Sequence, residues 1–166
     1  VNQPLLQVND LKKHYGQKGA VVRAVDGVSF HVDRGETLSL VGESGCGKST
    51  VGRAVLRLVP LTDGQVVLGG TRIDAFSAGA LRPLRRRMQV VFQDPFSSLN
   101  PRMKVREILA EPIRNFGLAK GRKAVDDKVA ALLDTVRLPR DAAGRYPHEF
   151  SGGQRQRIGI ARALAA

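Results

Sequence analysis

The stretch of sequence that decides the fold reads Val41-Gly42-Glu43-Ser44-Gly45-Cys46-Gly47-Lys48-Ser49-Thr50. It fits the pattern G-x-x-x-x-G-K-[ST], in which a strand leads into a glycine-rich loop and the loop leads into a helix. Glycines let successive backbone N–H groups converge on one anion, and the following helix adds the positive end of its dipole. The pattern therefore predicts a loop that binds phosphate groups.

Two side chains of this loop have predicted chemical roles. Lys48 supplies a full positive charge for the outer phosphates, and the Ser49 hydroxyl can bind Mg²⁺. Cys46 occupies a free position of the pattern and is interpreted as a small filler. The alternative, a glycine loop with an incidental lysine, is disfavoured by the flanking segments: a strand pattern at Glu36–Val41 precedes the loop, and a helical stripe from Val51 to Leu58 follows it.

The rest of the chain divides into a part rich in strands and a part rich in helices. Strands are predicted at Val21–Val32 around an Asp26-Gly27 turn, at Gln65–Leu68 between two glycine turns, and at Met88–Phe92. Helices are predicted from Val105 until Pro112 bends or ends the pattern, from about Arg122 to Arg137, and from Gln154 to Ala166. The order is therefore strands with one helix, followed by helices only.

The composition of the chain limits the classes of protein to which it can belong. The 166 residues carry 27 basic and 15 acidic side chains, a net charge of +12, and 42% of the residues are hydrophobic. The one cysteine excludes an internal disulfide, and no apolar run approaches the roughly 18 residues that a membrane span needs. Half of the basic excess lies in Leu81–Arg106, which predicts either a solvated basic face or a surface for nucleic acid, an anionic membrane or an acidic partner.

A second glycine motif, Phe150-Ser151-Gly152-Gly153-Gln154, also precedes a predicted helix. It is either another phosphate-binding helix start or an ordinary helix entry. The two motifs, with Gln93 between them, resemble the ATP-binding subunit of an ABC transporter. Gly42–Thr50 resembles the Walker A loop of that family and Gln93 its Q-loop glutamine. Ser151–Gln154 resembles the signature motif, with Phe150 where leucine is usual, and Tyr15 lies where the family places a ring against adenine.

Three longer runs are similar to dipeptide and oligopeptide importer ATPases, and relatives that import nickel or glutathione share them. They are Val41–Thr50, Gln93–Arg102 and Arg145–Glu149. The resemblance implies the α/β fold of a P-loop NTPase, with a RecA-like parallel sheet core, an N-terminal antiparallel β-subdomain and a helical subdomain, whose C-terminal part is missing. It divides residues 1–166, a partial ABC-type domain, into a nucleotide-binding core (1–95), a Q-loop and helical subdomain (96–150), and the signature motif with its helix (151–166).

The resemblance also implies ATP and Mg²⁺ as cofactors. The residues expected to contact ATP are Tyr15, Gly42, Glu43, Ser44, Gly45, Cys46, Gly47, Lys48, Ser49, Thr50, Ser151, Gly152, Gly153 and Gln154. Ser49 and Gln93 would bind Mg²⁺, and Lys48 and Gln93 would take part in catalysis. In the family, the Asp, the general base and a later histidine follow the signature helix, so we expect a full-length ATPase but no turnover by these residues alone. His148 is interpreted as a structural residue.

The implied partners are other proteins of a transporter. They are a second ATP-binding subunit in a homodimer or heterodimer, permease subunits reached through Asp94–Val105, and indirectly a substrate-binding protein, which places the chain peripherally on the cytoplasmic side of the inner membrane. No nucleic acid is expected. The alternatives are a nucleic-acid-processing ATPase of the same superfamily, which usually carries a coiled-coil or zinc-finger insertion, and a truncated product that binds ATP without turnover.

Overall fold

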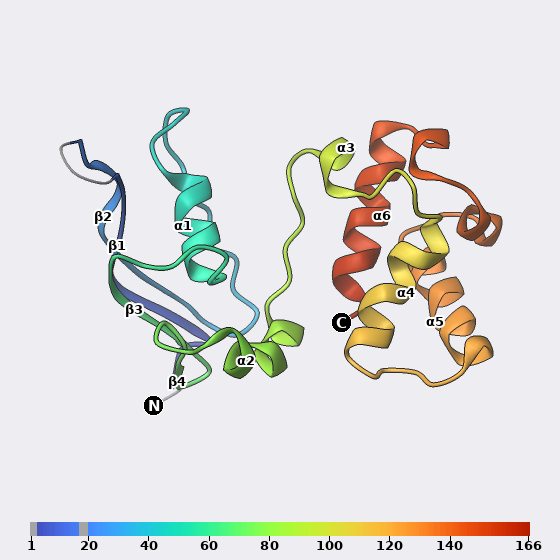
Figure 1. Cartoon of the computed structure of the whole chain (residues 1–166), viewed down its shortest axis with the longest axis horizontal. Helices are drawn as coiled ribbons and strands as arrows, with labels where there is room; N and C mark the ends of the chain where they lie inside the picture. Colours follow the sequence, from blue (N-terminus) through green and yellow to red (C-terminus); the bar gives the residue numbers. More distant parts are fainter. Residues whose placement is uncertain (1–2, 17–19) are drawn as a thin grey trace. The chain divides into compact units, whose positions relative to one another are not determined.

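Antiparallel strand pairing organises the first half of the chain. In the computed structural model, which describes residues 3–16 and 20–166, four strands form one sheet in the order β2-β1-β3-β4 (Figure 1). They are β1 (Leu6–Tyr15), β2 (Val22–Val32), β3 (Asp63–Leu68) and β4 (Thr71–Arg72). The strand predicted at Gln65–Leu68 is confirmed, and Gly69 and Gly70, both at positive φ, make the turn that follows it. The predicted Asp26-Gly27 turn is wrong, because β2 continues through both residues.

A bulge in β1 sets which side chains reach the core. Asp10 has a φ of 47°, and the pairing of β1 with both neighbouring strands shifts between Val8 and Lys12. As a result, Val8 and Leu11 are both fully buried although they are three residues apart. The bulge lies directly against Gly64, because a Cβ added to Gly64 would lie 2.3 Å from the Asp10 carbonyl oxygen. After the bulge, Leu11 and Lys13 continue along the inner face of the sheet.

Helix α1 (Lys48–Val55) packs against β1 and β2. Val51 and Ala54 are buried, as the predicted stripe requires, but the helix ends before the exposed Leu58 and well before Pro60. Short helix α2 (Ala78–Leu81) begins at Ser77, whose hydroxyl accepts a hydrogen bond from the Ala80 N–H.

Two strand predictions are wrong. Within the described residues, no strand forms at Glu36–Val41 or at Met88–Phe92. Their apolar pattern is typical of parallel strands that neighbours cover on both faces, but a strand forms only where a second strand accepts its hydrogen bonds. Here the side chain of Val41 is 92% exposed. Within the described residues all strand pairs are antiparallel, so the sheet seen is the antiparallel β-subdomain of the expected fold.

The second half of the chain is helical. After 3-10 helix η1 (Arg82–Arg87) come α3 (Pro95–Ser98), α4 (Val105–Asn115), α5 (Arg122–Thr135), η2 (Arg140–Gly144), η3 (Pro147–Glu149) and α6 (Gly152–Leu164). The predicted start of α5 is confirmed. Pro112 does not end α4, which continues for three residues because Leu109 and Ile113 are anchored in the core that α4, α5 and α6 share.

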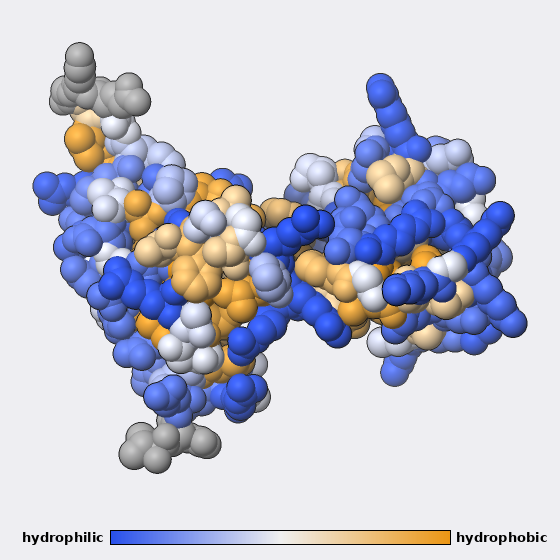
Figure 2. Space-filling view, turned by 60° about the horizontal axis from the view of Figure 1, so that its bottom comes forward, coloured by the Kyte–Doolittle hydropathy of each residue, from blue (hydrophilic) through white to orange (hydrophobic). Residues whose placement is uncertain are grey.

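The chain falls into two units, Val1–Arg82 and Pro83–Ala166, and each is described by itself. Apolar surface is visible on both units in Figure 2. Among the described helices, none combines the length and the apolar character needed to cross a lipid bilayer.

Candidate functional site

The glycine-rich loop of the first unit has a backbone conformation that favours glycine. Gly45 and Gly47 have φ values of 83° and 95°, in the left-handed region. Gly47 also lies directly against β2, since an added Cβ would sit 2.1 Å from the Ala24 carbonyl oxygen. The loop is therefore pressed onto the sheet at one point and turns there into α1.

The start of α1 has backbone N–H groups that have no hydrogen-bond acceptor within the helix. The first hydrogen bond of the helix is donated by the Val51 N–H to the Gly47 carbonyl at 2.9 Å. Gly47 has no side chain that could cap the helix, and no acidic residue lies in the first turn. Three N–H groups, those of Lys48, Ser49 and Thr50, therefore have no acceptor within the helix, which is the arrangement that binds oxyanions.

The Lys48 side chain folds back over the loop. Its Nζ donates hydrogen bonds to the carbonyl oxygens of Gly42, at 2.7 Å, and of Glu43, and lies 3.5 Å from the Cys46 sulfur. Within residues 3–16 and 20–166, no carboxylate forms an ion pair with this ammonium group. The loop thus concentrates a positive charge and free N–H groups at one place, and a phosphate group can replace the carbonyl oxygens as acceptor.

Tyr15 ends β1 with 41% of its surface exposed. It pairs with Val22 in β2, two residues before Ala24, against which Gly47 packs. The ring and the glycine-rich loop therefore both adjoin the same end of β2. The Lys13 Nζ lies 4.7 Å from the centre of the Tyr15 ring.

Gln93 and the segment after it belong to the second unit. Gln93 is exposed, and Asp94 begins α3 by accepting a hydrogen bond from the Phe96 N–H at 2.8 Å. This bond is the main reason why the pKa of Asp94 lies below its usual value. The segment is fastened to α6, because the Arg155 guanidinium lies 4.2 Å from the centre of the Phe96 ring and Arg162 donates to the Ser98 carbonyl at 2.6 Å.

The second glycine motif begins α6 with a capping box. The Ser151 hydroxyl accepts a hydrogen bond from the Gln154 N–H, and the Gln154 side chain accepts one from the Ser151 N–H. Unlike the start of α1, this helix start has side chains that accept hydrogen bonds from its own backbone N–H groups. Gly152 faces Phe96 with 3.9 Å between that ring and an added Cβ, whereas an added Cβ at Gly153 would meet open space.

The residues before Ser151 hold the motif in place. Phe150 is 4% exposed, and the Arg145 guanidinium lies 4.4 Å from the centre of its ring. The His148 ring stacks on Tyr146 with 5.7 Å between ring centres, and the His148 carbonyl accepts a hydrogen bond from Arg155. These contacts give His148 a packing role, in line with its interpretation as a structural residue.

The sequence-predicted residues thus fall into two groups. Tyr15 and Gly42–Thr50 lie together in the first unit, and Gln93 lies with Ser151–Gln154 in the second. Sequence reasoning missed Lys13 and Arg155. The seven-residue spacing of Arg155 and Arg162, two turns of one helix face, is a signal that could have indicated the contact of α6 with the segment after Gln93.

Comparison with known proteins identifies the family of the chain. The sequence model of the family described as ABC transporter matches residues 25–166. The oligopeptide transport ATP-binding protein OppF of Bacillus subtilis is 52% identical over 166 residues, which cover 99% of this chain and 54% of OppF. The putative oligopeptide transport ATP-binding protein YkfD of the same organism is 53% identical over 163 residues, which cover 98% of this chain and 50% of YkfD. The chain spans about half the length of the curated relatives it matches.

A solved structure is also similar to this chain. The dimeric post-hydrolysis state of the ATP-binding cassette MJ0796, bound to ADP and Pi, matches with a TM-score of 0.84 at 28% sequence identity. The match covers 96% of this chain and 69% of that chain.

Proposed function

Because this chain belongs to the ABC transporter family, as its motifs indicated, we propose that it is the ATP-binding part of an importer subunit that couples ATP hydrolysis to the uptake of di- or oligopeptides. One observation carries the proposal. The start of α1 offers three N–H groups without an acceptor in the helix, next to the Lys48 ammonium group. The choice of peptides rests on the names of the relatives, both of which are oligopeptide transport proteins or putative ones.

The described residues fit a nucleotide. Lys48 and the N–H groups of Ser44–Thr50 would hold the phosphates, and hydrogen bonds to charged groups of this kind contribute about 1.5–3 kcal/mol each. Tyr15 would stack on adenine, since its ring is exposed and adjoins the end of β2 against which the loop packs. Stacking of a base on an aromatic ring contributes about 1–3 kcal/mol.

Two side chains would hold Mg²⁺. Ser49 is exposed in the first turn of α1, and Gln93 is exposed before α3, so both have an oxygen free to bind a metal. A bound Mg²⁺ would neutralise phosphate charge as the bond to the outer phosphate breaks. Lys48 would stabilise the same charge, and Gln93 would orient the attacking water.

A second ATP-binding subunit would complete the site. Ser151 and Gly153 would contact the outer phosphate of a nucleotide held by the Lys48 of the opposite subunit, whether that subunit is identical or different. The open space beside Gly153 supports close approach of another molecule. ATP binding would then close the dimer, and hydrolysis would open it.

The segment Asp94–Val105 would contact the permease. Phe96 is 63% exposed, yet it is tied to Arg155 of the helix that follows the signature motif. Movement of the signature helix would therefore reach the permease directly. We place the subunit peripherally on the cytoplasmic side of the inner membrane, where a substrate-binding protein on the other side delivers the solute to the permease.

The test is ATP binding by the full-length protein with Lys48→Ala, measured by calorimetry. We expect the affinity to fall at least tenfold, because the charge-assisted contacts of Lys48 are lost. Arg53→Ala is the matched control, since it removes one positive charge from the other end of α1 and should leave the affinity within about twofold. Equal effects of the two variants would contradict the proposal.

A further inference from the structure

Lys13 is an unusual residue in the sheet. It is a charged residue that is only 9% exposed, and the Asp74 side chain, which is covered to a similar degree, forms an ion pair with Arg72. It pairs with Val25 in β2, and directly paired residues point to the same face of a sheet. A Val25 methyl group lies 3.7 Å from where a Cβ on Gly47 would be. Lys13 therefore emerges on the face that carries the glycine-rich loop.

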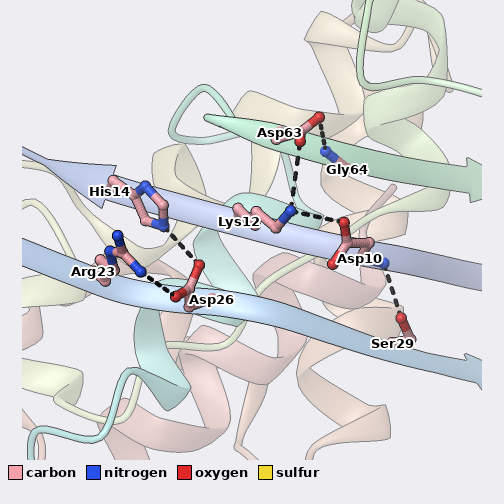
Figure 3. A network of polar contacts seen from close by, with 8 residues as sticks. All are labelled: Asp10, Lys12, His14, Arg23, Asp26, Ser29, Asp63 and Gly64. Atoms are coloured by element: carbon pink, nitrogen blue, oxygen red, sulfur yellow. Dashed lines mark hydrogen bonds and ion pairs between the residues drawn. The ribbon is translucent and has the colours of Figure 1, made fainter.

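The acidic partners of β1 are on the opposite face. Lys12 forms ion pairs with Asp10, at 2.9 Å, and Asp63, at 3.6 Å, and His14 contacts Asp26 at 3.0 Å (Figure 3). Side chains alternate along a strand, so Lys13, between Lys12 and His14, points away from this network. In the part of the chain that the structure describes, no carboxylate pairs with Lys13.

What the Lys13 ammonium does contact is the Tyr15 ring, 4.7 Å from Nζ to the ring centre. A buried charge without a counter-ion is costly, and the negative face of an aromatic ring compensates part of that cost. A cation over one face of the ring also leaves only the other face for a second planar group. The contact therefore fixes the orientation of Tyr15 and selects the ring face that a base can use.

We propose that Lys13 is a positioning residue for the base of the nucleotide, acting through the Tyr15 ring. The inference rests on the proposed function, because it requires that Tyr15 stacks on adenine. It assigns to Lys13 no contact with the phosphates, which distinguishes its role from that of Lys48.

The experiment measures binding of ATP and of inorganic tripolyphosphate, which has no base, to the full-length protein with Lys13→Met. Methionine keeps the apolar stem and the volume of the side chain but removes the charge. We expect the ATP affinity to fall about threefold to fivefold, the size of one cation–π contact, and the tripolyphosphate affinity to stay unchanged. Lys12→Met is the matched control on the opposite face and should change neither affinity.

A Tyr15→Leu background separates positioning from a structural role. There Lys13→Met should have no further effect on ATP binding, because the ring through which it acts is gone. The inference is overturned by an unchanged ATP affinity in Lys13→Met, by an equal loss for tripolyphosphate, or by the same loss in the Tyr15→Leu background. If the unmutated protein binds neither compound, the proposed function itself fails, and this inference fails with it.

Discussion

Replacing Gly47 with alanine tests the geometry of the glycine-rich loop in two separable ways. The first is conformational, because Gly47 has a φ of 95°. The second is steric, because the new Cβ would lie 2.1 Å from the carbonyl oxygen and 3.3 Å from the carbonyl carbon of Ala24. Both of these atoms are backbone of β2, so no side-chain rotation relieves the clash, and the loop has to move away from the sheet.

Each of the two causes has its own expected cost in folding free energy. A left-handed backbone costs a residue with a Cβ about 1–2 kcal/mol. Overpacking adds about 1–3 kcal/mol. Gly47→Ala should therefore lower the free energy of unfolding by about 2–5 kcal/mol. Displacement of the loop should also lower the ATP affinity at least tenfold, since the N–H groups of α1 no longer converge on the phosphates.

Two other glycines supply the controls. Gly45 has a φ of 83° but open space around an added Cβ, so Gly45→Ala should show only the conformational loss of about 1–2 kcal/mol. Gly52 lies inside α1 with open space and without a positive φ, so Gly52→Ala should raise stability by about 0.5–1 kcal/mol. Urea denaturation followed by circular dichroism, together with calorimetric titration of ATP, measures both quantities. A Gly47→Ala variant no less stable than Gly45→Ala would refute the steric argument.

Two further predictions concern a surface pair and the signature motif. The hydrogen bond from His14, more than that from Arg23, keeps the pKa of Asp26 below its usual value. Since the pKa of a lowered carboxyl is higher in the unfolded chain, Asp26 stabilises the fold above the unfolded value of about 4, and this contribution is lost as the pH falls below it. Asp26→Asn should therefore flatten the acid limb of the stability–pH curve, and a limb as steep as that of the unmutated protein would contradict this cause. Ser151→Ala removes a cap and should lower stability by about 1 kcal/mol, whereas Ser151→Asp keeps a cap but places a negative charge where a phosphate is proposed to bind. Normal stability with lost ATP hydrolysis is expected for Ser151→Asp, and hydrolysis at the rate of the unmutated protein would argue against the signature role.

Elements governed by local sequence were predicted well. The glycine-rich loop, the helix that follows it and the start of α5 at Arg122 depend on glycine positions and on helical periodicity within a few residues. The strand errors have a different origin. Glu36–Val41 has the composition of a buried parallel strand, but a strand also requires a partner, and composition does not say whether one lies alongside.

The burial of Lys13 depends on a bulge that the sequence did not indicate. Without the bulge at Asp10, alternation from the buried Val8 would place Leu11 and Lys13 on the outer face. The bulge reverses the alternation and places Lys13 on the inner face, whereas Lys13 and Tyr15, two residues apart, share a face with or without it. Sequence similarity indicated the ring, and a spacing of two residues along a strand could have indicated the lysine that contacts it. The burial of that lysine follows only from the register of the strands.

The most direct measurement of the central claim is a structure of the full-length protein with Mg²⁺ and a non-hydrolysable ATP analogue. The account predicts that the triphosphate lies within hydrogen-bonding distance of the N–H groups of Lys48, Ser49 and Thr50, and that the Lys48 ammonium has left the Gly42 carbonyl to contact it. A triphosphate bound elsewhere, with Lys48 still donating to Gly42, would contradict it.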